Sequence, residues 1–175
     1  MSKQPEVVLV GARFNVERRW LTRRDGGTEP RELVVHPGSV VILPLLDDGR
    51  IVMIRNQRFS VERTLWELPA GTRDPDEPVQ ECAARELEEE TGYRAAKLVP
   101  LLSFYPAPGI SNERMHAFVA TGLTPVAQQL DPTEHIDVCP LGPAQITRML
   151  EAGELEDAKS IAVLLYHRLV MPGPA

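Results

Sequence analysis

The sequence is poor in cysteine and in aromatic residues. Its 175 residues include only Cys82 and Cys139, whose separation matches no metal-ligand spacing, so a cysteine-bound metal centre is excluded. Cys82 falls on the expected inward face of a helix, which favours a reduced thiol in the core. Aromatic residues make up 5% of the chain, so Phe14 and Trp20 each invite a search for a role.

Long apolar runs and basic stripes are also missing. No stretch approaches about 18 apolar residues, and no apolar run follows a basic segment at the start of the chain. The net charge is −6, with lysines and arginines scattered along the sequence. These absences argue against a membrane span and against nucleic acid as the main partner. We expect a soluble cytoplasmic protein.

What the chain does have is an acidic segment, residues 71–93, with the sequence GTRDPDEPVQECAARELEEETGY. Six glutamates fall within the fourteen positions from Glu77 to Glu90. Pro78 suits the first turn of a helix, and Gly92 suits the residue just after its end. The alanines, leucine and glutamates between them are good helix formers. The segment therefore predicts a helix over residues 78–91.

The phase of this helix places carboxylates where a core-facing stripe is expected. At about 100° per residue, Glu86 and Glu90 project on the same side of the helix as Val79. Glu89 lies at the edge of this core-facing stripe, whereas Glu88 points to water. Carboxylates clustered on a half-buried face repel one another and lose solvation. Either their pKa values rise or a hard cation such as Mg²⁺ or Mn²⁺ compensates them. The plainer alternative is a solvated acidic helix paired with arginines such as Arg85.

The spacing of the same residues favours the metal. Gly71, Glu77 and the run from Arg85 to Tyr93 resemble the Nudix box at its nine specified positions, Tyr93 being a mild departure from an aliphatic residue. The resemblance implies divalent-metal-dependent hydrolysis of a nucleoside diphosphate linked to another moiety. It also implies a strand–loop–helix in which Gly71 opens the loop.

Two segments are expected around this motif. Residues 1–37 read as a small antiparallel β element with strands at 7–16, 18–22 and 31–36, the last two joined by an Asp-Gly-Gly turn. Residues 38–175 read as the main domain. It begins with a hairpin of apolar strands, 39–46 and 50–57, around Asp47-Asp48-Gly49.

The rest of the main domain supplies further strands and two helices. Strands are expected near 95–104, near 113–123 and after the acidic loop at 130–137, followed by two helices separated at Gly153. The inner side of the second helix is predicted to carry Ile161, Leu164, Leu165 and Leu169. The prediction is an α/β (α+β) chain with a mixed β-sheet sandwiched between helices, which agrees with the Nudix fold.

Segments outside the box point to a branch of the family. Over about residues 36–170 the chain resembles the ADP-ribose pyrophosphatases. Five segments together carry this resemblance: HPGSVVILPLL, RNQRF, WELPAG, SFYPAPGISNE and ELEDAKSIAVLLY. Pro108 stands fifteen residues after the box, as in that group. The resemblance implies cleavage of ADP-ribose to AMP and ribose 5-phosphate. Hydrolysis of a sugar nucleotide such as GDP-mannose, or of another dinucleotide, is the alternative; a non-catalytic ligand-binding module is a third reading.

The resemblance implies roles for particular residues. The expected metal ligands are Glu86, Glu90 and Glu89, with the carbonyl of Ala70. Arg85 is expected to orient a glutamate. The general base is left open among Glu134, Asp131 and Glu113. Arg58 matches an arginine that related enzymes place beside the nucleotide. A homodimer is expected, in which N-terminal strands carrying Phe14 and Trp20 complete the neighbour's substrate site.

Overall fold

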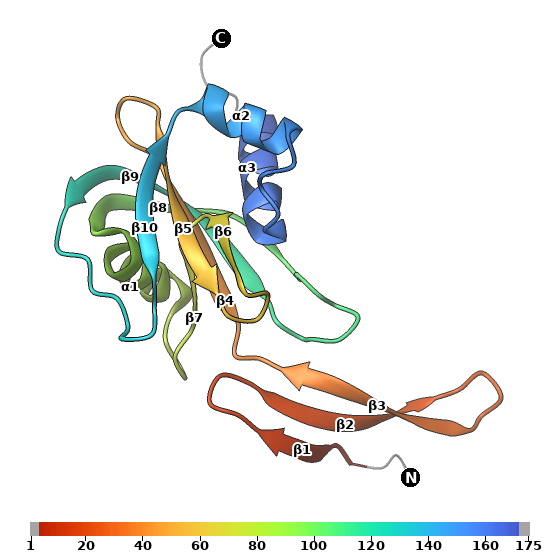
Figure 1. The fold of residues 1–175 in the computed structure, drawn as a ribbon. Helices are drawn as coiled ribbons and strands as arrows, with labels where there is room; N and C mark the ends of the chain where they lie inside the picture. The colour runs from red at the N-terminus through yellow and green to blue at the C-terminus, as the bar shows by residue number, and fades with distance from the viewer. Residues whose placement is uncertain (1–3, 172–175) are drawn as a thin grey trace.

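The computed structural model describes residues 4–171, so the outer residues of both expected segments, 1–3 and 172–175, lie outside it. Figure 1 shows a small sheet beside a larger body of strands and helices. Within the described residues, the elements follow in the order β1 (Glu6–Val10), β2 (Asn15–Thr22), β3 (Thr28–Val35), β4 (Ser39–Pro44), β5 (Ile51–Arg58), β6 (Arg63–Glu67), β7 (Ala70–Thr72), α1 (Val79–Thr91), β8 (Tyr93–Phe104), β9 (Met115–Pro125), β10 (Ile136–Leu141), α2 (Pro143–Glu151) and α3 (Ala158–Val170).

The N-terminal element is an antiparallel sheet in the order β1-β2-β3. The single strand expected over residues 7–16 is wrong, because the chain turns between Gly11 and Phe14. The Gly11 amide donates to the Phe14 carbonyl at 3.0 Å, and Asn15 already pairs back with Val10. A run of apolar residues at 7–10 hid this turn. The β2–β3 hairpin forms as expected, with Thr22 opposite Thr28.

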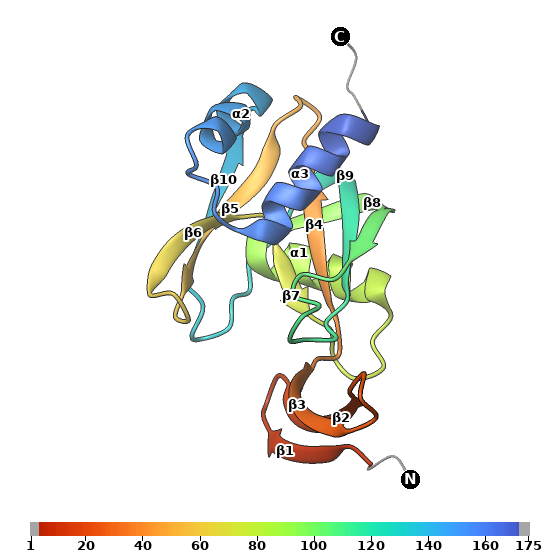
Figure 2. The same ribbon diagram turned by 90° about the vertical axis from the view of Figure 1, so that its right-hand side faces the viewer.

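The centre of the main body is a mixed sheet in the order β7-β4-β9-β8, where β4 and β9 are parallel and the other pairs antiparallel. Every residue of β4 is buried, so both faces of the sheet are covered. Val40 and Ile42 pack with α1 on one face. Val41 and Leu43 pack on the other face, in a cluster that includes residues of α2 and α3 (Figures 1 and 2). The predicted sandwich is therefore confirmed.

The hairpin expected from residues 39–46 and 50–57 is only partly present. The Leu46 amide donates to the Arg50 carbonyl at 2.9 Å, and Leu45 bridges Ile51, but the strands then separate. β5 joins a second sheet, in the order β10-β5-β6. The reason is that β7 and β9 already pair with the two edges of β4. No edge of β4 is left for β5.

The inner face of α3 also differs from the prediction. Val163 and Leu164 are buried, but Leu165 and Leu169 are 42% and 80% exposed. The Ser160 hydroxyl accepts from the Leu68 amide at 2.7 Å, and Ser160 itself is fully buried. This bond fixes the rotation of the helix, because a buried amide must keep its acceptor. The inner face of α3 therefore includes the polar Ser160, which a pattern of apolar residues does not predict.

Two further expectations concern cysteines and membrane spans. Cys82, on the inward face of α1, is buried in the core as a free thiol, as predicted, and Cys139 is a free, half-buried thiol on β10. Among residues 4–171, no helix has the length and apolar character needed to cross a membrane.

Candidate active site

Helix α1 forms where the sequence predicts it. Pro78 is its N-cap residue, and the chain leaves the helix at Gly92, whose φ of 67° is the left-handed conformation that glycine adopts without strain. Cys82, Ala83 and Leu87 are fully buried against the mixed sheet. Because these residues fix the inward face, Glu90, one turn after Leu87, is drawn inward with them.

Glu90 is the most deeply buried carboxylate of the helix, with 3% of its surface exposed. One of its oxygens accepts from the Ala70 amide at 2.8 Å. Burial raises the pKa of Glu90 to about 8, with nearby Glu86 adding to the effect, even though the Ala70 amide and Arg58 oppose it. The protein therefore holds a carboxylate that is costly to ionise unless a cation approaches.

Glu86 lies over the glycine that opens the loop. A Cβ on Gly71 would fall 1.9 Å from the Glu86 carboxyl carbon, so only glycine permits this approach. The Glu86 side chain is 13% exposed. Burial raises its pKa to about 7, although the adjacent Arg85 pulls the pKa down. Gly71 is thus needed for the space that the Glu86 carboxylate occupies.

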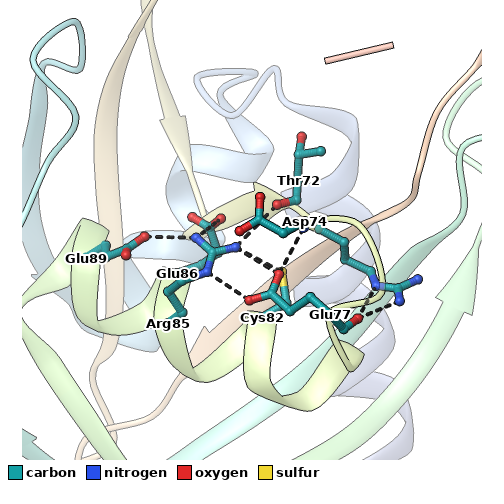
Figure 3. Close-up of polar contacts among 8 residues, drawn as sticks. Thr72, Asp74, Glu77, Cys82, Arg85, Glu86 and Glu89 are labelled. Carbon is teal, nitrogen blue, oxygen red and sulfur yellow. Dashed lines mark hydrogen bonds and ion pairs between the residues drawn. The ribbon is translucent and has the colours of Figure 1, made fainter. Parts of the chain in front are cut away.

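Arg85 joins the start of the helix to its acidic end (Figure 3). Its guanidinium donates to both oxygens of Glu77 at 2.9 and 3.0 Å, to Glu86 at 2.8 Å and to Glu89 at 2.9 Å. The hydrogen bond from Arg85 is the main reason that the pKa of Glu77 falls to about 2. Glu77 also accepts from the Asp74 amide, so the loop and the helix are tied together through one ion pair.

The donor set suits a hard cation, although its members are not gathered around one point. No group of three His, Cys, Asp or Glu side chains within residues 4–171 is close enough to enclose a metal ion. Glu86 and Glu90, however, are buried carboxylates with raised pKa values, and Glu89 stands beside them with 38% of its side chain exposed. Carboxylate oxygens at the wall of an open cavity fit Mg²⁺, which takes few protein ligands and keeps several waters.

The cavity beside α1 has a volume of about 750 Å³. Segments far apart in the sequence line it, from the β1–β2 turn to the start of α3. Nine of the residues predicted for the site lie in its wall: Arg58, Ala70, Arg85, Glu86, Glu89, Glu90, Glu113, Asp131 and Glu134. Phe14, Trp20 and Pro108 do not line it; Pro106 does, two residues before Pro108.

The three candidate bases differ in how they are held. Glu134 is half-buried, accepts from the Asp131 amide at 3.0 Å, and its charge helps to raise the pKa values of both Glu86 and Glu90. Asp131 is exposed. Glu113 accepts from the Ser39 hydroxyl at 2.6 Å. The charge of Glu134 thus acts on both Glu86 and Glu90.

Sequence reasoning missed several residues of the cavity wall. Ala12 and Arg13 reach it from the β1–β2 turn, Arg73 from the loop after β7, and Lys159 from the start of α3. Each is unremarkable within its own segment, and only the fold brings them together. The tip of the N-terminal sheet thus lies against the cavity of its own chain.

Comparison with known proteins agrees with this geometry. Residues 35–164 match the NUDIX domain family. An ADP-ribose pyrophosphatase of Bacillus subtilis is 37% identical over 147 residues, which cover 83% of this chain and 80% of the relative. An ADP-ribose pyrophosphatase of Mycobacterium tuberculosis is 36% identical, with 96% and 83% covered. The crystal structure of an ADP compounds hydrolase superposes with a TM-score of 0.83 at 28% identity, covering 97% of this chain and 92% of the other.

The fold, the glycine loop and the glutamate helix define a hydrolase of the diphosphate-cleaving type. The chain belongs to the NUDIX domain family, and it is an enzyme of that family rather than a ligand-binding module.

Proposed function

We propose that this enzyme hydrolyses ADP-ribose to AMP and ribose 5-phosphate with Mg²⁺, or Mn²⁺ in its place. The observation that carries the proposal is the buried Glu90 and the largely buried Glu86 in the wall of a cavity of about 750 Å³. The relatives named above support the choice of an ADP-ribose substrate. A diphosphate linked to two sugars also needs a long, open cavity rather than a closed pocket, and segments from both ends of the chain border this one.

Glu86 and Glu90, with Glu89 and the carbonyl of Ala70, would hold the metal. A bound divalent cation would neutralise the charge on the diphosphate oxygens and lower the pKa of a bound water. Arg85 acts as a positioning residue, because it contacts the carboxyl groups of Glu86 and Glu89. Arg58, whose side chain is 34% exposed in the cavity wall, would contact the substrate.

Glu134 is the general base that we favour, because its charge acts on both buried carboxylates. Glu134→Gln should lower kcat by about 10²–10⁴-fold if this side chain takes the proton of the attacking water. Asp131→Asn and Glu113→Gln serve as comparisons. If one of these two variants alone has that effect, the base is that residue and not Glu134.

The experiment that tests the function is a substrate panel with product identification. ADP-ribose, GDP-mannose and a dinucleotide are incubated with Mg²⁺, with Mn²⁺ and with EDTA, and the nucleoside monophosphate and phosphosugar released are quantified. The proposal requires AMP and ribose 5-phosphate in equal amounts, the highest kcat/KM for ADP-ribose, and no turnover in EDTA. A higher kcat/KM for GDP-mannose or the dinucleotide would reassign the substrate.

A homodimer built through the N-terminal sheet is part of the same proposal. Four successive apolar residues of β1, Val7 to Val10, are between 47% and 77% exposed. A second subunit packed on β1 would remove this apolar surface from water. In this arrangement Phe14 and Trp20 would reach the neighbour's substrate site. The division at residues 37 and 38, the cytoplasmic location and the lack of nucleic-acid or membrane partners stay predictions.

A further inference from the structure

Arg58, Asp157 and Lys159 of the cavity wall belong to an ionic network centred on the buried Glu67. This carboxylate, at the end of β6, is 1% exposed. Arg58 donates to its two oxygens at 2.8 and 2.6 Å, a bidentate pair. Lys159 donates to one of the same oxygens at 2.5 Å and lies 3.0 Å from Asp157. Two cations are therefore held by one carboxylate.

Glu67 does not need both cations for its own burial. A bidentate arginine already neutralises a carboxylate and binds both of its oxygens. Lys159 is nevertheless drawn to the same point, with only 13% of its side chain exposed. The ammonium also lies 3.0 Å from Asp157, so the two cations and the two carboxylates of this network balance. The network therefore holds the ammonium group of Lys159 in place at the cavity wall.

Both cations retain donors that the network does not use. The ammonium of Lys159 has three N–H groups, and its contacts within residues 4–171 are with Glu67 and Asp157. Arg58 uses Nε and Nη2 for Glu67, which leaves Nη1 without an acceptor among the same described residues. Both side chains line the cavity. Their remaining N–H groups are thus available to an anion that enters it.

The surrounding bonds hold this network rigidly. Asp157 caps α3 by accepting from the Ser160 amide at 3.0 Å, and the Ser160 hydroxyl binds the Leu68 amide, next to Glu67, at 2.7 Å. Lys159 is therefore anchored at the first turn of a helix and Glu67 at a strand end that the same helix fixes. Donors that are already ordered lose little entropy when an anion binds.

We propose that Lys159 and Arg58 together bind a phosphate oxygen of the substrate, and that Glu67 is the positioning residue that aims both cations. The inference rests on the proposed function, which supplies the phosphate, and adds Lys159 as a residue that sets affinity. The acidic wall at Glu86, Glu89 and Glu90 takes the cation, and the wall at Lys159 takes the anion.

The test compares kinetics and binding in two variants. Lys159→Met should raise the KM for ADP-ribose by about 10-fold or more, since a hydrogen bond to a charged group contributes about 1.5–3 kcal/mol, and should change kcat less than about 3-fold. Lys159→Arg should restore much of the affinity. Calorimetry with AMP and with ribose 5-phosphate, in Mg²⁺, should show weaker binding of whichever product carries the contacted phosphate.

Glu67→Gln separates positioning from packing. It keeps the side-chain volume but removes the charge that orients Arg58 and Lys159, so the KM should rise while thermal melting shows a folded protein. Arg63→Met is the matched control: it removes an exposed cation paired with Glu156, near the same helix, and should leave KM unchanged. Should Lys159→Met fail to fold, Lys159→Gln replaces it.

The inference is overturned if the folded Lys159 variant binds both products and ADP-ribose as the wild type does, or if Arg63→Met raises KM equally. A wild-type enzyme that releases no AMP from ADP-ribose would instead refute the proposed function. The two failures are therefore distinguishable.

Discussion

The glutamates of α1 have different surroundings although they are adjacent in the sequence. Glu90 is almost fully buried, whereas Glu88 has 29% of its side chain exposed and forms an ion pair with Arg94 at 2.8 Å. Glu89 has 38% of its side chain exposed and is held by Arg85. The cause is the helix phase, which Cys82, Ala83 and Leu87 fix by packing on the sheet. A carboxylate's position relative to those three residues decides whether it is available to a metal.

Glu90→Gln tests this distinction. The variant keeps the shape of the side chain and removes its charge, so kcat should fall by roughly 10²-fold or more, the scale of losing one electrostatic stabiliser. Glu88→Gln, which removes an equal charge from the solvent side of the same helix, should leave kcat within about 2-fold of the wild type. Near-normal turnover in Glu90→Gln would contradict the metal assignment.

Gly71→Ala tests the contact between the loop and the helix. The added Cβ would fall 1.9–2.2 Å from the Glu86 carboxyl group, which must move away from the cavity wall. We expect a loss of affinity for Mn²⁺, measured by calorimetry, and at least about a 10-fold drop in kcat. Gly109→Ala is the control, because a Cβ at Gly109 meets nothing within 4 Å. Equal losses in both variants would show that the effect is not specific to Glu86.

How far the sequence reveals individual residues depends on their spacing. Glu86 and Glu90 are one helical turn apart in the sequence, so helix periodicity alone placed them on the same face. Lys159 lies 92 residues from Glu67, and no local pattern connects them. Arg13 reaches the cavity only because the chain turns at Gly11, directly after the apolar run at residues 7–10. Residues that only the tertiary structure brings together show no periodic pattern in the sequence.

At the scale of elements, prediction succeeded where a local signal was decisive. Helix α1 has a proline before it and a left-handed glycine after it, and both of its ends lie within one residue of the predicted positions. The β4–β5 hairpin has an equally clear turn at Asp47-Asp48-Gly49, yet its strands belong to two sheets. A turn fixes where the chain reverses; which strand pairs with which depends on the edges that β7 and β9 already occupy.

The pKa values along α1 predict how pH acts on this helix. Glu86 and Glu90 have pKa values of about 7 and 8, above the ordinary value of 4.5. Without metal, the folded state therefore binds more protons than the unfolded state between about pH 4.5 and 8, and its free energy of unfolding falls as pH rises through that window. Metal binding must displace those protons, so affinity should rise with pH.

Two measurements check this coupling. Thermal melts in EDTA should show a melting temperature that declines from pH 5.5 to 8.5, and Mn²⁺ should raise it most at the upper end. In Glu90→Gln both pH effects should become smaller, because one of the two titrating groups is gone. A metal affinity that stays constant from pH 6 to 8.5 would contradict the assignment of these carboxylates as ligands.

At the scale of the whole molecule, the N-terminal sheet is attached to the body by few bonds. The Val34 amide donates to the Ile110 carbonyl at 2.8 Å, Asn112 donates back to Val34, and the His36 amide donates to the Asn112 side chain. All five residues of β1 are exposed. An exposed apolar edge strand such as β1 is open to pairing or packing with another chain. Its surroundings in the working enzyme should therefore include more than this one chain.

Removing residues 1–34 tests that expectation. If the sheet packs across a two-fold interface, sedimentation should show a dimer for the full chain and a monomer for the truncated one. The KM for ADP-ribose should rise by about 10-fold or more, because stacking of a base on an aromatic ring contributes about 1–3 kcal/mol and Phe14 and Trp20 are lost. The truncation also removes Arg13 from the cavity wall of the same chain. The affinity for Mn²⁺ should persist, since Glu86 and Glu90 belong to the other segment.

A milder variant separates assembly from loss of the aromatic residues. Val10→Asp places a charge on a side chain that is 77% exposed, so the single chain should fold as before. A covered Val10 would make that charge costly, and the dimer should dissociate at concentrations where the wild type stays associated. In the monomeric variant the KM should rise as in the truncated protein, because Phe14 and Trp20 are present but no longer reach a neighbour. A truncated enzyme that still dimerises and has the wild-type KM would refute the arrangement.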